Sequence, residues 1–248
     1  MELIFIAGGV FLVLLLLLAQ SLSKGVGTVG GALKQVGLFV LQKNPPGLVD
    51  IFDDRDGSGS RTWMNFGMLW LVFATLLGFL LGWHTYDPTA LDSLASVGWS
   101  YDDGSSLREA TLNFLTIALL YGLVGSGMVA TARNGNGRLA SEANASMVAL
   151  LLTAVLLATY ILPFIFGFLD VDTSENPIRT ILYSLETLAV GLLLVPVFIN
   201  LLITAANRGD QELQTSVWFL LMGIAAYIIS MLYICLLYTS DAADEMDG

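Results

Sequence analysis

Residues 64–83 read MNFGMLWLVFATLLGFLLGW, a run of twenty residues without one charged side chain. A helix rises about 1.5 Å per residue, so this run can cross the roughly 30 Å of hydrocarbon in a bilayer. Hydrocarbon offers backbone amides no partner, so a spanning segment must be a helix or a strand of a closed barrel. Because apolar and polar residues do not alternate here, the run predicts a transmembrane helix.

Five further stretches along the chain have the same apolar character. They cover roughly Leu3–Ala19, Ala110–Thr131, Ala145–Leu169, Ile178–Ala205 and the residues from Val217 into the tail. The mean hydropathy of +0.76 and the charged fraction of only 12% suit a protein embedded in lipid. The sequence therefore predicts an all-α, polytopic transmembrane bundle of about six helices, with no separate soluble domain.

The basic residues between the apolar stretches predict the orientation of the bundle. Five of the ten lie between the first and second stretches and two between the third and fourth. Loops on the cytoplasmic side carry an excess of Lys and Arg, so we expect these two loops inside and the N-terminus outside. The net charge of −11 argues against nucleic acid as a partner, because nucleic acid requires a basic surface. The expected partner is the lipid bilayer.

The end of the chain differs in character from the rest. Residues 235–245 read CLLYTSDAADE, which resembles a translated sequencing adapter. We therefore expect residues 235–248 to be a non-native tail and the natural protein to continue past Ile234. The tail holds the only cysteine and four acidic residues; without it the net charge is about −7 and no thiol remains for chemistry. Before it we expect two parts, an extra transmembrane helix with a cytoplasmic interfacial segment in residues 1–60 and an incomplete five-helix membrane region in residues 61–234.

Polar residues inside the apolar stretches are the candidate functional residues, because polar and ionisable groups are costly in hydrocarbon. Glu186 lies about eight residues, or about 12 Å, into the fifth stretch. It could relay protons, pair with a cation, or simply form a hydrogen bond inside the bundle. Asn113, Asn200 and Thr111 are expected to hold neighbouring helices together by hydrogen bonds. Arg108 opens the third stretch and could extend to the membrane interface.

Two pairs of small residues also have the spacing that lets helices approach closely. Gly78 and Gly82 lie four residues apart in the second stretch, and Gly122 and Ser126 lie four apart in the third. These pairs predict helix packing rather than a particular partner.

The sequence offers few ligands for a metal or a haem. Such sites in helix bundles use imidazole, thiolate or clustered carboxylates. The only histidine, His84, lies at the outer end of the second stretch, where we interpret it as a polar cap. No paired carboxylates, glycine-rich phosphate loop or Ser-His-Asp set is evident. The residues themselves therefore predict no catalysis.

Four short motifs nevertheless resemble the first helices of the catalytic subunit of haem-copper oxidases, in particular the cbb3-type oxidase and nitric oxide reductase branch. They are LREATLN at 107–113, RLAS at 138–141, INLLITAANR at 199–208 and VWF at 217–219. Their counterparts in that branch are a Leu-Arg pair opening a helix and followed by His and Asn, a short cytoplasmic turn, an Asn-bearing helix end closing in Arg, and an aromatic pair opening the next helix. The order and spacing of these elements agree over residues 63–234.

The resemblance implies an N-terminal fragment of a respiratory terminal oxidase-like subunit of a prokaryotic plasma membrane. Such an oxidoreductase reduces oxygen or nitric oxide with haem and copper and assembles with other respiratory subunits. The resemblance also implies that Arg108 contacts a haem propionate. The fragment alone would not be an enzyme, because the ligands of the haem-copper centre lie on later helices of the family.

One position departs from the family pattern. The histidine that binds the low-spin haem falls on Thr111 of this chain, and a threonine hydroxyl does not replace imidazole on iron. This departure leaves two other functions open. The first is a non-catalytic polytopic scaffold subunit. The second is a transporter whose site combines Glu186 with a broken helix at Pro196.

Overall fold

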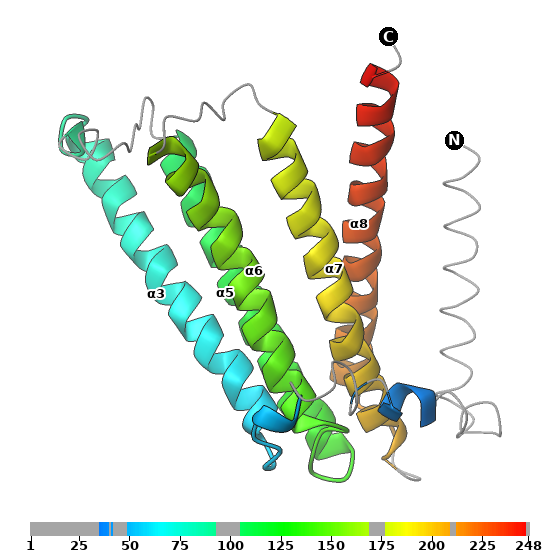
Figure 1. The fold of residues 1–248 in the computed structure, drawn as a ribbon. Helices are drawn as coiled ribbons and strands as arrows, with labels where there is room; N and C mark the ends of the chain where they lie inside the picture. Colours follow the sequence, from blue (N-terminus) through cyan, green and yellow to red (C-terminus); the bar gives the residue numbers. More distant parts are fainter. Residues whose placement is uncertain are drawn as a thin grey trace.

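The computed structural model describes residues 35–39, 41, 49–92, 105–168, 177–208 and 212–246. Within these ranges the chain forms helices and connecting turns, and no strand. The elements are the 3₁₀ turn η1 (Val49–Ile51) and the helices α3 (Ser58–Tyr86), α5 (Ser105–Asn134), α6 (Glu142–Phe168), α7 (Pro177–Ala206) and α8 (Thr215–Met246) (Figure 1). The predicted all-α helix bundle is therefore confirmed.

Four of these helices contain segments long and apolar enough to cross a membrane. The segments are Ser58–Tyr86, Leu107–Asn134, Glu142–Thr159 and Glu186–Ala206, and α8 adds a shorter apolar segment at Thr215–Met231. The second to fifth predicted spans are thus confirmed as helices, and the chain is an integral membrane protein. The predicted first span, Leu3–Ala19, lies outside the described residues.

The helices form a bundle in which α3 flanks one side and α8 the other (Figure 1). Helix α3 packs on α5 and α6, and α7 packs on α6, α5 and α8. Only 17% of the apolar segment of α3 is buried, against 67% of the segment in α6. Large apolar side chains such as Met68 and Phe79 are consequently exposed on α3, as expected for a helix whose outer face meets lipid.

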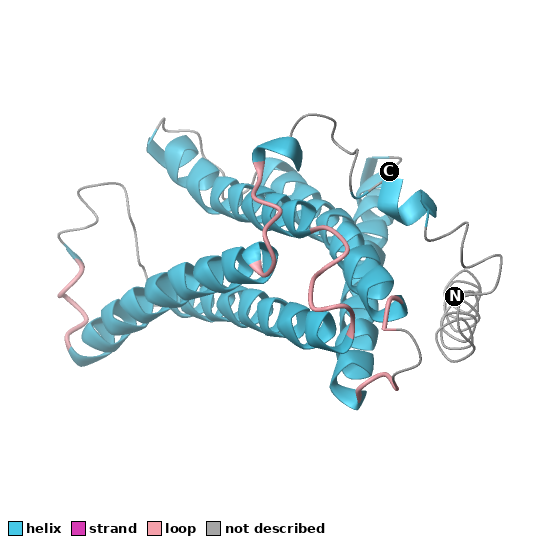
Figure 2. Cartoon of the chain, turned by 90° about the horizontal axis from the view of Figure 1, so that it is seen from below, coloured by secondary structure: helices cyan, strands magenta, loops and turns pink. Residues whose placement is uncertain are grey.

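Basic side chains gather at one end of the bundle, which we call the basic end. There α3 and α6 begin and α5 and α7 finish, and Figure 2 views the bundle from this side. The arginines at the basic end are Arg55, Arg61, Arg133, Arg138 and Arg208. Arg108, by contrast, lies at the start of α5, at the opposite end. The described parts of the two loops predicted to be cytoplasmic therefore lie on one side of the bundle, as the positive-inside rule requires.

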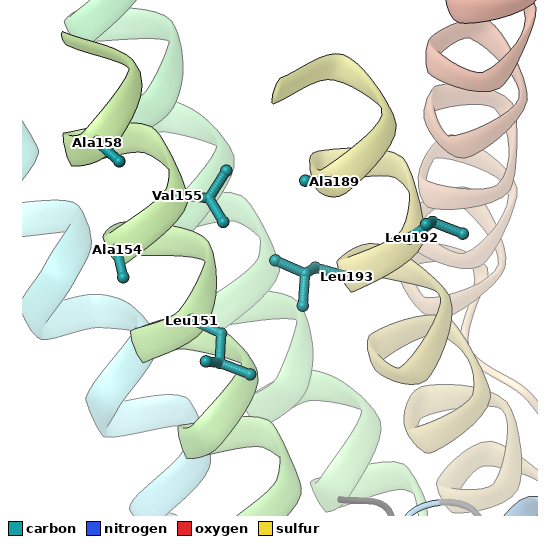
Figure 3. Close-up of a pocket in the computed structure, with 7 residues that line it drawn as sticks. All are labelled: Leu151, Ala154, Val155, Ala158, Ala189, Leu192 and Leu193. Atoms are coloured by element: carbon teal, nitrogen blue, oxygen red, sulfur yellow. The ribbon is translucent and has the colours of Figure 1, made fainter. Parts of the chain in front are cut away.

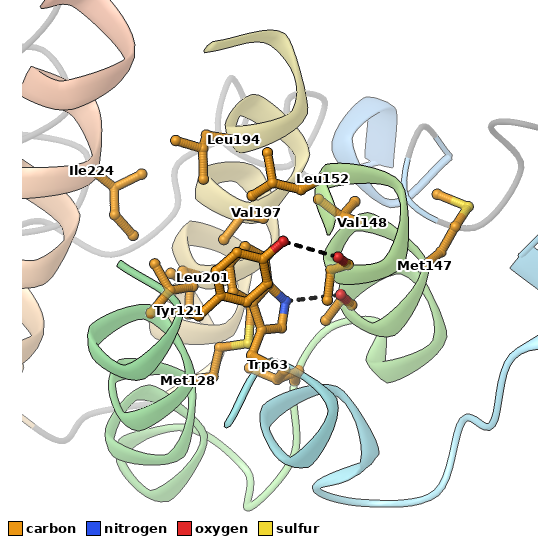
Figure 4. Packing of buried hydrophobic residues seen from close by; sticks show 14 of the residues in the cluster. Trp63, Tyr121, Met128, Met147, Val148, Leu152, Leu194, Val197, Leu201 and Ile224 are labelled. Carbon is orange, nitrogen blue, oxygen red and sulfur yellow. Dashed lines mark hydrogen bonds between the residues drawn. The ribbon is translucent and has the colours of Figure 1, made fainter. Parts of the chain in front are cut away.

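A buried aromatic pair ties three helices together. The ring centroids of Trp63 on α3 and Tyr121 on α5 are 4.8 Å apart. The Trp63 Nε1–H donates to the carbonyl of Ala145 on α6 at 2.9 Å, and the Tyr121 hydroxyl donates to that of Ala149 at 3.1 Å (Figure 4). Both side chains are fully buried. These bonds fix the register of α3 and α5 against α6.

The close approach of α3 and α5 is tightest at glycines that the spacing pattern does not single out. A Cβ built on Gly82 or on Gly122 would meet nothing within 4 Å, so a side chain would fit at these two predicted positions. A Cβ on Gly67 would lie 3.2 Å from the backbone N of Gly122, and a Cβ on Gly125 would lie 3.0 Å from Cγ of Met64. Gly67 and Gly125 are therefore the positions where a side chain would separate the helices.

Candidate functional site

Buried polar side chains are concentrated at the basic end. There the loop before α3, the turn before α6 and the last turns of α7 meet through hydrogen bonds. We call the contributing residues the polar junction; they are Asp54, Arg138, Ser141, Glu142, Asn200 and Thr204.

Glu142, the first residue of α6, is the most connected member of the polar junction. Its side chain is almost fully buried, at 1% exposure. Oε1 accepts hydrogen bonds from the amides of Gly57 at 3.0 Å and Leu139 at 3.1 Å, and Oε2 accepts one from the amide of Gly59 at 2.9 Å. The first amides of a helix lack partners within the helix and favour a negative charge. Helix α3 has no side-chain cap of its own at Gly57, so Glu142 provides its cap from another helix.

Asp54, in the loop that precedes α3, caps the N-terminus of α6. Its Oδ1 accepts hydrogen bonds from the amides of Glu142 at 3.2 Å and Ala143 at 3.4 Å. Its Oδ2 pairs with the guanidinium of Arg138 at 3.0 Å. The N-termini of α3 and α6 are therefore capped reciprocally, each by a carboxylate from the other's segment.

The ion pairs of Arg138 contribute less than these amide bonds. Besides Asp54, its Nε lies 3.6 Å from the carboxylate of Asp56, and the Arg138 side chain is 45% exposed. Exposed ion pairs typically add about 0–1 kcal/mol, because water and salt screen them. The stability of the polar junction rests mainly on its buried hydrogen bonds.

Helix α7 joins the polar junction through Asn200, which is fully buried. The Asn200 amide pairs with the backbone of Ser141: Nδ2 donates to its carbonyl at 2.7 Å and Oδ1 accepts from its N–H at 3.3 Å. One turn later, the Thr204 hydroxyl accepts from the amide of Ala140 at 2.9 Å and donates to the carbonyl of Asn200 at 2.7 Å. The RLAS and INLLITAANR motifs are thus in direct contact.

The candidates in the LREATLN motif lie far from the polar junction, near the start of α5. Arg108 and Asn113 are exposed, so Asn113 does not hold two helices together in the way we predicted. Thr111 is half-buried, and its hydroxyl donates to the carbonyl of Leu107 in its own helix at 2.8 Å. Its methyl group faces α3, 3.6 Å from a Cβ built on Gly78. Of the predicted helix-joining residues, only Asn200 forms its contact between helices.

The described residues do not fit a haem or copper ligand set. The Thr111 hydroxyl is used within its own helix, and a hydroxyl is not an axial ligand of the kind that haem iron takes from imidazole or thiolate. His84, the only histidine of the sequence, lies in the last turn of α3. In the described part of the chain no three His, Cys, Asp or Glu side chains are placed to share a metal ion. No reaction step through haem or copper can therefore be assigned to these residues.

Glu186 is separate from the polar junction. It lies on α7, half-buried and 14 residues before Asn200, which is about 21 Å along a helix. Helix α7, which carries Glu186, packs on both α6 and α8.

A groove runs between α6 and α7 beside Glu186. It has a volume of about 540 Å³ and is lined only by aliphatic side chains, namely Leu151, Ala154, Val155, Ala158, Ala189, Leu192 and Leu193 (Figure 3). These residues belong to the membrane-spanning segments of α6 and α7.

Comparisons with protein-family models, with curated proteins and with solved structures find no match to this chain. The function is therefore inferred from the residues and their contacts. Sequence reasoning missed Asp54 and Glu142, the two capping carboxylates. No local signal marks them, because Gly57 is an ordinary N-cap residue and the two carboxylates accept amides more than eighty residues away.

Proposed function

We propose that this bundle is the helical scaffold of a respiratory terminal oxidase-like membrane subunit. The contact between Asn200 and Ser141 is the main support, because it joins two of the four motifs on which the resemblance rests. These two motifs, RLAS and INLLITAANR, are distant in sequence but contact each other through two hydrogen bonds. The contact gives a structural reason for Asn at position 200.

The role as scaffold follows from how the polar groups are used. In the polar junction, the side chains of Glu142 and Asn200 form hydrogen bonds with backbone groups of neighbouring segments. They hold the ends of α3, α6 and α7 together. Reduction of oxygen or nitric oxide by haem and copper would require ligands from residues other than those described. The bundle's part in such a subunit would be to position helices.

A second candidate is a dedicated non-catalytic membrane subunit, built on the same scaffold. The observation that favours it is Thr111, which stands where the resembling enzymes carry a haem histidine and which bonds to its own helix. The transporter hypothesis is less well supported. It required a broken helix at Pro196, whereas α7 continues through this proline as a helix from Pro177 to Ala206.

The proposal is tested by assembly in membranes of the source cells. A tagged chain should migrate on a native gel within a complex that shows haem absorption. Asn200→Ala should reduce the amount of this complex, whereas the exposed control Asn113→Ala should not. Migration of the wild-type chain outside any haem-containing complex would contradict the oxidase-like proposal. If the complex contains haem, removing the chain and measuring oxygen and nitric oxide consumption separates a catalytic from a purely structural subunit.

A further inference from the structure

We propose that a short helix at the basic end lies in the membrane surface and inserts Val36 and Phe39 among the acyl chains of that leaflet. The short helix comprises the described residues 35–39 and 41, and Figure 1 shows it as a blue ribbon beside the lower end of α7. Its partner is phospholipid, at the boundary between headgroups and acyl chains. The proposal does not depend on the oxidase-like function, because it involves no haem ligand and no redox step.

The short helix packs directly on the last two turns of α7. Gly37 is buried, and a Cβ built on it would lie 2.7 Å from Cδ1 of Ile203 and 3.2 Å from Cγ2 of Ile199. Since a side chain at position 37 would have to push these isoleucines aside, glycine allows the two helices to approach closely. The position of the short helix is therefore set by its contact with α7.

The short helix is apolar on two of its faces. Residues three or four apart share a face of a helix. Leu41, four residues after Gly37, is fully buried and belongs to the face that contacts the bundle. Val36 and Phe39 are three residues apart, and 61% and 67% of their surfaces are exposed. The described part of the chain therefore leaves an outward apolar face on the short helix uncovered.

The depth of the contact on α7 indicates what covers this outward face. The spanning segment of α7 has 21 residues and ends at Ala206, so its length of about 30 Å matches the hydrocarbon of a bilayer. Ile203 and Ile199 lie three and seven residues before that end, or about 5 and 10 Å inside it. Helices that lie in a membrane surface bury their apolar face to about 5–10 Å. Lipid, rather than water, therefore surrounds the outward face.

The short helix links the membrane surface to the polar junction. Ile199 and Ile203, which contact Gly37, each directly precede a residue of the polar junction, Asn200 and Thr204. The last turns of α7 are therefore held by hydrogen bonds on one face and by the short helix on an adjoining face. Anchoring the short helix in lipid fixes the depth of this end of α7 in the membrane.

Nitroxide labels on single cysteines test what surrounds the outward face. Val36→Cys and Phe39→Cys are made in the full chain with Cys235→Ser, which removes the only native thiol, and the protein is placed in liposomes. Leu119→Cys, on an exposed part of the α5 span, is the lipid control, and Arg55→Cys, in the loop before α3, is the water control. Oxygen concentrates in hydrocarbon, whereas a charge-neutral nickel chelate stays in water. Oxygen should relax the labels at 36, 39 and 119 more strongly than the chelate does, and the order should reverse at 55.

Two results of this measurement would overturn the proposal in proteins that are folded by circular dichroism. Relaxation by the chelate at 36 and 39 as strong as at 55 would place the outward face in water. Weak relaxation by both reagents would show that a second copy or another protein covers it.

A second pair of variants tests the contact with α7. Gly37→Leu, whose side chain would meet Ile203, should increase the mobility of the label at position 39. Gln35→Leu, at an exposed position of the same helix, is the matched control and should leave that mobility unchanged. Equal mobility in the two variants would show that the short helix is not positioned by α7, and the depth assigned to it would then be wrong.

Discussion

Glu142 and Asp54 cap each other's helices. The carboxylate of Glu142 accepts the amides of Gly57 and Gly59 at the start of α3, and the carboxylate of Asp54 accepts the amides of Glu142 and Ala143 at the start of α6. The two residues are 88 positions apart in the chain. Since capping partners are usually local, this arrangement makes each helix start depend on the position of the other.

Glu142→Ala should destabilise the bundle strongly. The substitution leaves two buried amides and one partly buried amide without this acceptor, and each unsatisfied buried group costs about 1–3 kcal/mol. We expect the free energy of unfolding in mixed micelles to fall by about 3 kcal/mol or more. Glu109→Ala, at an exposed position of α5, is the control and should change it by less than about 0.5 kcal/mol. Equal effects of the two substitutions would show that the caps do not hold the fold.

Asn200→Ala should loosen the contact of α7 with the turn before α6. It removes both hydrogen bonds to the backbone of Ser141, and hydrogen bonds between membrane helices are worth about 0.6–2 kcal/mol. Because Asn200 and Thr204 hold the adjacent backbone groups of Ser141 and Ala140, the double variant with Thr204→Val should be non-additive. A double-mutant cycle on unfolding free energies measures this coupling. Additivity within error would mean that the two residues act independently.

Gly67→Ala should separate α3 from α5, whereas Gly82→Ala should not. The new Cβ at position 67 would lie 3.2 Å from both the backbone N of Gly122 and the Cβ of Tyr121. At position 82 it would meet nothing within 4 Å, and alanine favours a helix over glycine by about 1 kcal/mol. A lower melting temperature for Gly67→Ala and an equal or higher one for Gly82→Ala is the expected pair of results. The opposite order would place the close contact elsewhere.

Asp87, in the loop after α3, should titrate below the ordinary range of aspartate. The hydroxyl of Thr89 donates to its Oδ1 at 2.8 Å and the amide of Thr89 at 3.0 Å, and these bonds to the charged form lower its pKa. The folded pKa thus lies below the unfolded one. The resulting stabilisation is present above the unfolded pKa and is lost as the pH falls through the folded pKa. Carboxyl ¹³C shifts during an NMR titration measure this, and Thr89→Ala should raise the pKa.

The spans were predictable from sequence because their cause is local. An apolar run such as residues 64–83 must be helical in hydrocarbon whatever its neighbours are. The tight contacts were not predictable in the same way. Gly82 and Gly67 look alike in the sequence, and only the rotation of α3 against α5 decides that the side chain at 67 would clash. Spacing patterns carry no information about that rotation.

The residues of the candidate site were likewise predictable only where the cause is local. Asn200 could be selected as a helix-joining residue because an amide inside an apolar run needs a partner, and it has one in Ser141. The same reasoning failed for Asn113, which lies exposed on α5. Asp54 and Glu142 resembled ordinary charges near helix ends, because their partners are amides of a segment more than eighty residues away.

The cap that α6 supplies to α3 bears on the biogenesis of the protein. Gly59 leaves the ribosome 83 residues before Glu142, so α3 is synthesised and inserted while its acceptor does not yet exist. Until then the first amides of α3 must be hydrated at the membrane surface. Insertion of α6 then replaces that water with the carboxylate of Glu142. The start of α3 is therefore fixed only after α6 has been inserted. A nascent chain released before position 142 would lack the cap of α3, and we expect quality-control proteases to degrade it.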